Sequence, residues 1–140
     1  MAPNVEDLLA QARDLEESDI GRARSLVQQA RVMARAEHKP VAEAEALYRL
    51  AELSYASGLT NEAFAVALEA RDLAHRCGAP KIEVAALNLI AAVQYHASNF
   101  SEALASALSI IAFVLLSALA GQLADSFDKA RIIRIVKIGR

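Results

Sequence analysis

The stretch AEALYRLAELSYASGLTNEAFAVALEA, residues 44–70, contains two helical patterns separated by a short turn signal. In each half, apolar residues recur at intervals of three and four positions, which is the spacing of one face of an α-helix. Ser57 and Gly58 lie between the halves, and glycine is common where a helix ends. The stretch therefore predicts a helical hairpin, two helices joined by a tight turn.

The same pattern returns at a spacing of forty residues. The second half, 58–70, aligns with 18–30 and with 98–110, and each copy has an alanine at the same position. These alanines are Ala23, Ala63 and Ala103. The first half aligns with 84–97 and, more weakly, with 4–17. Because a hairpin with apolar sides must pack on its neighbour to bury them, the repeat predicts an all-α fold of stacked helix-turn-helix hairpins, with turns near 17–19, 57–59 and 97–99.

Several residues of this repeat resemble the tetratricopeptide repeat family, in a forty-residue variety. They are Leu50, Ala51, Gly58, Ala63, Ala67, Ala70, Ile90, Ala91, Ala103 and Ala107. Ser98 departs from the pattern, since it replaces the turn glycine in the third unit, and Ile110 replaces a small residue. The resemblance implies a TPR-like α-solenoid over residues 1–110 that binds a protein or peptide ligand on its concave face.

The resemblance also implies which residues line that face, because the first helix of each unit forms it in this family. The predicted peptide-binding residues are Glu45, Tyr48, Glu52, Tyr55, Asn88, Tyr95 and His96. Tyrosine offers a large contact area with a polar tip, and the amide of Asn88 can bind a peptide main chain. An alternative interpretation is that Tyr55 and Tyr95 only pack between hairpins.

The third unit loses the stop signal of the earlier ones. Helices are expected to end at AEHKP, residues 36–40, and at RCGAP, residues 76–80, where Gly78 is suited to a left-handed helix end. The matching residues 116–120 read LSALA, without proline. We therefore expect the helix to continue and residues 111–140 to form an apolar C-terminal helix with a basic tail. In 131–138, the spacing fits a helix and, nearly as well, a strand, and the β-branched residues favour the strand locally.

Residues 103–124 carry no charge, and three interpretations compete for them. They form a buried helix at the end of the array, a transmembrane helix, or a contact with a second copy of the chain. A span needs about 20 residues, but alanines and serines dilute this one, and its first part follows the repeat. We favour a homodimer that exchanges the long helix, and the membrane interpretation stays open. The predicted self-association residues are Ile111, Phe113, Val114, Leu116, Ile132, Ile133 and Val136.

The sequence contains no motif for catalysis, nucleotide binding or metal binding. There is no phosphate-binding glycine loop, no HExxH and no GxSxG, and Cys77 is the only cysteine. We therefore expect no enzymatic activity, no catalytic residues, no cofactor and no metal site. The formal net charge of −2 gives the chain no electrostatic attraction to nucleic acid.

The expected role is a non-enzymatic interaction module, either a scaffold or a regulatory sensor. The N-terminus lacks the order of basic and apolar residues found in a secretory signal, which favours a cytoplasmic location. An alternative is a dimerisation or sensor fragment of a larger signalling protein.

Overall fold

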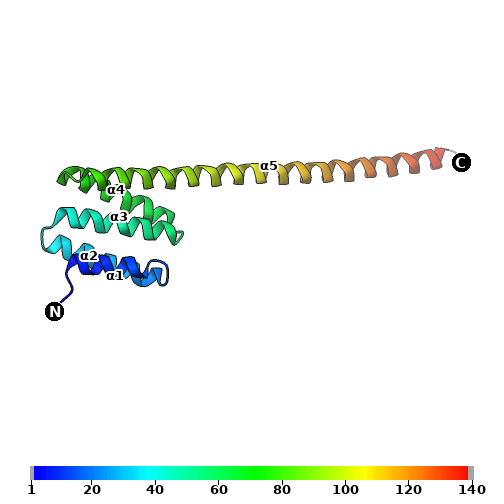
Figure 1. Ribbon diagram of the computed structural model, residues 1–140. Helices are drawn as coiled ribbons and strands as arrows, with labels where there is room; N and C mark the ends of the chain where they lie inside the picture. The colour runs from blue at the N-terminus through cyan, green and yellow to red at the C-terminus, as the bar shows by residue number, and fades with distance from the viewer. Residues whose placement is uncertain (1, 139–140) are drawn as a thin grey trace. The chain divides into compact units, whose positions relative to one another are not determined.

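A computed structural model describes residues 2–138, except for the side chains of residues 130 and 132–138. Within residues 2–138 the chain forms five α-helices and no strand. Figure 1 shows their order along the chain. The helices are α1 (Val5–Leu15), α2 (Ile20–Ala36), α3 (Pro40–Ala56), α4 (Thr60–Cys77) and α5 (Pro80–Ile138). The prediction of an all-α protein with a long apolar C-terminal helix is therefore confirmed.

Local sequence signals account for where these helices begin. Asn4 and Asp7 form a capping box at α1, in which the Asn4 side chain accepts from the Asp7 backbone N–H at 2.8 Å. At α2 there is a side-chain cap without a box, in which Asp19 Oδ1 accepts from the Arg22 backbone N–H at 3.0 Å. Both α3 and α5 begin with a proline, Pro40 and Pro80, whose missing N–H would have no partner in the first turn anyway.

Residues with positive φ lie in three of the connections, His38 between α2 and α3 with φ 54° and two glycines. Gly58, between α3 and α4, has φ 78°, and Gly78, after α4, has φ 72° and ψ 42°. Glycine adopts this left-handed conformation without the steric cost that a Cβ brings. The predicted turn at 57–59 and the predicted left-handed end at Gly78 are both confirmed.

The core of the first four helices is built largely from small residues. Each helix packs on the next one along the chain, α1 on α2, α2 on α3 and α3 on α4. Alanines at matching repeat positions of α2 and α4 are all fully buried: Ala23, Ala30, Ala34, Ala63, Ala70 and Ala74. Since alanine has only a Cβ, helix backbones can approach closely along these positions.

The beginning of α5 belongs to the same packed body. Ala86 of α5 lies in one cluster with Leu47 and Ala70, and Ile90 lies in another with Ala51 and Ala67. By its internal contacts the chain divides into two compact units, Met1–His96 and Ala97–Arg140. The repeat pattern instead predicts a boundary after residue 110.

The predicted third hairpin is absent. The turn expected at 97–99 does not form, because α5 is continuous over 59 residues and includes 98–110. Ser98 replaces the glycine that turns the chain at Gly58, and serine is tolerated inside a helix. Ala103 is consequently exposed, whereas its counterparts in α2 and α4 are buried. The prediction that the helix continues through 116–120 is confirmed, and the backbone of 131–138 is helical rather than extended.

Candidate functional site

The predicted peptide-binding residues of α3 form one row along that helix. Glu45, Tyr48, Glu52 and Tyr55 follow each other at intervals of three and four residues, and all four are half-buried. The Tyr48 hydroxyl donates a hydrogen bond of 2.6 Å to Glu52 Oε1. Arg49 Nη1 lies 3.3 Å from Glu52 Oε2, so a phenol, a carboxylate and a guanidinium form one small network.

This network keeps Tyr48 protonated. Burial, and then the hydrogen bond to Glu52, raise the pKa of Tyr48 from 10.0 to about 12. Both causes favour the neutral phenol, because a buried phenolate beside a carboxylate would be poorly solvated and repelled. At neutral pH, Tyr48 is therefore a fixed donor that holds the Glu52 carboxylate in place.

Three ring side chains meet where α3 ends. The ring centroids of Tyr55 and His96 are 5.9 Å apart, and those of Tyr95 and His96 are 5.8 Å apart with the rings nearly perpendicular. Tyr55 is half-buried, but Tyr95 is 65% exposed and His96 is exposed. Asn88, also exposed, precedes Tyr95 by two helical turns. Packing between helices therefore does not account for Tyr95.

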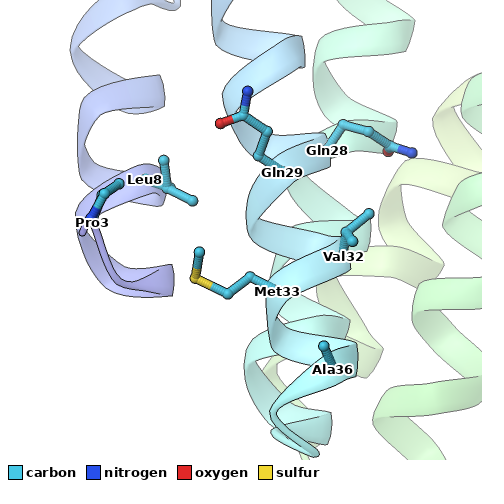
Figure 2. A pocket seen from close by; sticks show the side chains of 7 residues that line it. All are labelled: Pro3, Leu8, Gln28, Gln29, Val32, Met33 and Ala36. Carbon is cyan, nitrogen blue, oxygen red and sulfur yellow. The ribbon is translucent and has the colours of Figure 1, made fainter.

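Sequence reasoning did not predict an apolar cavity of about 470 Å³ near the N-terminus. Figure 2 shows its lining residues, which come from the stretch just before α1, the start of α1 and the second half of α2. They are Pro3, Leu8, Gln28, Gln29, Val32, Met33 and Ala36. The sequence feature that could have indicated this cavity is Val32, a β-branched apolar residue on the outer side of α2, where it is 61% exposed.

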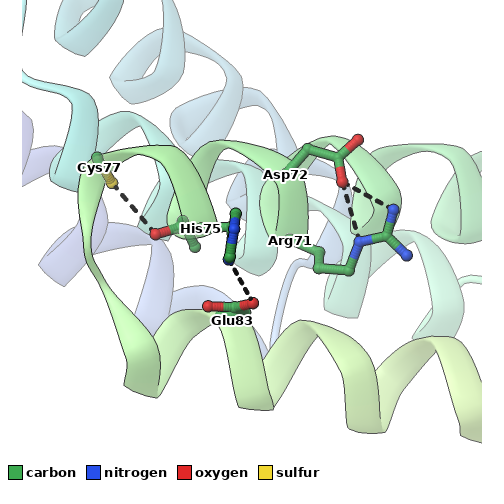
Figure 3. A network of polar contacts seen from close by, with 6 residues as sticks. Arg71, Asp72, His75, Cys77 and Glu83 are labelled. Atoms are coloured by element: carbon green, nitrogen blue, oxygen red, sulfur yellow. Dashed lines mark hydrogen bonds and ion pairs between the residues drawn. The ribbon is translucent and has the colours of Figure 1, made fainter.

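A polar network connects the end of α4 to the beginning of α5. His75 Nδ1 lies 3.0 Å from Glu83 Oε1, and Arg71 Nη2 lies 2.7 Å from Asp72 Oδ1. Figure 3 shows these side chains with the contacts between them as dashed lines. The thiol of half-buried Cys77 points to the Ala74 carbonyl at 3.7 Å. Among the described residues, no group of three His, Cys, Asp or Glu side chains is placed to hold a metal ion. We interpret the network as a structural link between the two helices.

Two ion pairs connect α2 to α4 along their outer sides. Arg24 Nη2 lies 2.8 Å from Glu62 Oε1, and two turns further Arg31 Nη2 lies 3.3 Å from Glu69 Oε2. In both pairs the partners are thirty-eight residues apart, so the pairing follows the repeat. These contacts set how α2 and α4, the corresponding helices of the first two copies of the repeat, are aligned along their lengths.

The part of α5 after His96 has a different character. We call residues 103–124 the apolar segment, and all of its residues are exposed in this chain, including Ile111, Phe113, Val114 and Leu116. Over the part of the chain that the structure describes, α5 holds one stretch long and apolar enough to cross a membrane, with a mean hydropathy of 2.4 and none of it buried. The side chains of Ile132, Ile133 and Val136 lie outside the described residues.

No protein-family model, curated protein or solved structure matches the chain.

Proposed function

We propose that the first unit, Met1–His96, is a non-enzymatic module that binds a peptide or a segment of another protein. The binding surface consists of α3 and the part of α5 up to His96. Its residues are Glu45, Tyr48, Glu52, Tyr55, Asn88, Tyr95 and His96. The role is that of a scaffold or regulatory sensor similar to a tetratricopeptide repeat protein.

The exposed aromatic cluster is the observation that carries this proposal. The core of the first unit is filled mainly by alanine and aliphatic side chains, so it leaves the rings of Tyr55, Tyr95 and His96 at the surface. Tyrosine is enriched at protein interfaces, because it buries a large area while its hydroxyl keeps a polar partner. Two ring contacts also restrict how these side chains move, which reduces the entropy lost when a ligand binds.

The charges around the cluster indicate what kind of ligand fits. Glu16, Glu45 and Glu52 lie on or beside the binding surface, and Arg49 lies between two of them, 3.5 Å from Glu16 Oε1 and 3.3 Å from Glu52 Oε2. Three carboxylates against one guanidinium give the surface a net negative charge. We therefore expect a ligand that combines an apolar or aromatic side chain with Lys or Arg.

A selection from a random peptide library tests the proposal without knowledge of the natural partner. The purified chain is the bait, and the affinity of enriched peptides is measured by titration calorimetry. Tyr95→Ala should weaken their binding at least about tenfold, the effect expected when a central aromatic contact is removed. Enriched peptides should also carry more Lys and Arg than the unselected library.

The matched control is Val32→Ala, which removes an exposed apolar side chain from α2, away from the binding surface. It should leave peptide affinity unchanged. Peptides that bind the Tyr95→Ala and unmodified chains equally, but lose affinity on Val32→Ala, would reject the proposed surface and favour the apolar cavity instead.

A further inference from the structure

Most of the apolar segment aligns with α4 at the forty-residue spacing of the repeat. The two helices differ in the residues on the side that faces water in α4. That side of α4 carries Arg71, Asp72, His75 and Arg76. Asp72, His75 and Arg76 are exposed, and Arg71 is partly exposed. Forty residues later, the matching residues are Ile111, Ala112, Leu115 and Leu116.

The opposite side of the segment is apolar as well. The positions that are buried in α4, Ala63, Ala67, Ala70 and Ala74, correspond to Ala103, Ala107, Ile110 and Val114. The segment is therefore apolar on the side that α4 buries and also on the side that α4 leaves in water. A helix that is apolar on both of these sides must be covered on both, and the side between them carries only uncharged polar groups, those of Ser106, Ser109 and Ser117.

We propose that the apolar segment, residues 103–124, spans a lipid bilayer and anchors the chain in a membrane. A second copy of the chain packed against the repeat side would cover that side and leave Ile111, Leu115 and Leu116 in water. Hydrocarbon covers every side of a helix at once. This inference does not depend on peptide binding by the first unit.

The length of the segment fits a bilayer. Its 22 residues rise about 33 Å as an α-helix, against a hydrocarbon thickness of about 30 Å. A charged residue lies directly at each end, Glu102 before the segment and Asp125 after it. The uncharged stretch therefore begins and ends where a span should.

The few polar groups inside the segment are compatible with lipid. The continuous helix satisfies the backbone N–H and C=O groups internally, which is the main requirement in hydrocarbon. The Ser109 hydroxyl donates a hydrogen bond of 3.0 Å to the Ala105 carbonyl, one turn earlier. Gln122 lies within the last turn, near the expected headgroup region.

The basic residues around the segment are distributed asymmetrically. Residues 82–102 contain no Lys or Arg, whereas the sequence after the segment contains Lys129, Arg131, Arg134, Lys137 and Arg140. Such a bias is typical of the two flanks of a membrane span, with the basic flank on the cytoplasmic side. A contact between two copies of the chain in water does not require basic residues on one flank of the segment only.

Cell-free synthesis in the presence of sealed lipid vesicles tests the proposal. The full chain should stay with the vesicles after extraction with alkaline carbonate, which removes proteins that are only adsorbed. For sidedness, Cys77→Ser is combined with Ser18→Cys in one variant and with Ser126→Cys in another. A membrane-impermeant maleimide should label one of these cysteines in intact vesicles and the other only after detergent lysis.

Ile111→Arg combined with Leu116→Arg returns to the segment the charges that α4 carries at Arg71 and Arg76. Arginine near the centre of a span is unfavourable, so the extraction-resistant fraction should fall from most of the protein to below about a tenth. The matched control, Ile111→Leu with Leu116→Ile, keeps the segment apolar and should stay with the vesicles. Near-ultraviolet circular dichroism of the tyrosines, all of which lie in the first unit, verifies that this unit is folded in each variant.

Two results would overturn the proposal. In the first, both engineered cysteines are labelled from outside intact vesicles, which would mean adsorption to the surface. In the second, the unmodified chain is released by carbonate and is a soluble species of about twice 15.0 kDa without detergent. The second result would instead establish the homodimer as the partner of this segment.

Discussion

Residues 58–77 and 98–117 are copies of one repeat unit, yet they have different structures. The first copy turns at Gly58 and packs as α4, and the second continues α5 without a turn. Both have small residues at the first contact positions, such as Ala63 and Ala103, but Ile110 and Val114 replace Ala70 and Ala74 in the second copy. A pattern of small residues therefore permits a hairpin but does not by itself produce one. A residue suited to the turn and complementary side chains on the facing helix are also needed.

The charges that would pair with the second copy are missing from α4 or already paired there. Glu62 of α4 pairs with Arg24, but its counterpart Glu102 would have to pair with Phe64, the residue that occupies the position of Arg24. Arg71, the counterpart of Arg31, already binds Asp72 at 2.7 Å. At these two positions the outer side of α4 therefore offers no free cation to pair with another helix of the same type.

The largest expected effect comes from the small residues themselves. Ala63→Leu should destabilise the first unit by roughly 1–3 kcal/mol, because Ala63 is fully buried and leucine would overpack the contact. Ala103→Leu should change the stability of the same unit little, because Ala103 is exposed. Urea unfolding followed by tyrosine fluorescence measures this unit alone, since Tyr48, Tyr55 and Tyr95 all belong to it. Equal losses from both substitutions would mean that 98–110 packs as α4 does.

The turn residues should give a smaller effect, with opposite signs in the two copies. Gly58→Ala should destabilise the first unit by about 1 kcal/mol, because a Cβ is unfavourable at φ 78° although no atom lies near it. Ser98→Ala should instead raise the helicity of α5 slightly, since alanine has the higher helix propensity. Circular dichroism of both variants compares them directly. If Ser98→Ala lowered helicity, a turn near 97–99 would have to be reconsidered.

Much of the fold could be predicted from the sequence because its signals are local. These signals are the spacing of apolar residues, the prolines Pro40 and Pro80, and the glycines Gly58 and Gly78. Each acts within a few residues, and the first four helices begin and end where these signals predict. The third hairpin failed as a prediction because the residues that align 98–110 with 58–70 mark a helix but do not themselves place a turn before it. A turn at Ser98 would form only if the helix after it could pack against α4. The side chains on the surface of α4 decide this, and they lie far from Ser98 in the sequence.

The candidate site was predicted less completely, for a similar reason. Glu45, Tyr48, Glu52 and Tyr55, which the resemblance implies for the binding face, lie in one row on α3. The contact of His96 with Tyr55 depends on how α5 packs, and the hydrogen bond from Tyr48 to Glu52 depends on side-chain rotamers. The apolar cavity between α1 and α2 could not be predicted because its lining residues come from two helices and share no motif.

The smallest effect should come from the cross-helix charges. Glu62→Gln removes the charge that pairs with Arg24 at 2.8 Å, but both side chains are partly exposed, so the cost should be about 0.2–1 kcal/mol. Glu102→Gln, the same change one repeat later, should leave the stability of the first unit unchanged, because the matching cation is absent there. Tyrosine-detected urea unfolding at low and high salt measures both variants, and the Glu62→Gln loss should shrink as salt screens the pair. A loss from Glu102→Gln as large as that from Glu62→Gln would show that the second copy has a cationic partner in the first unit. That outcome would break the distinction between the two copies on which the membrane proposal is built.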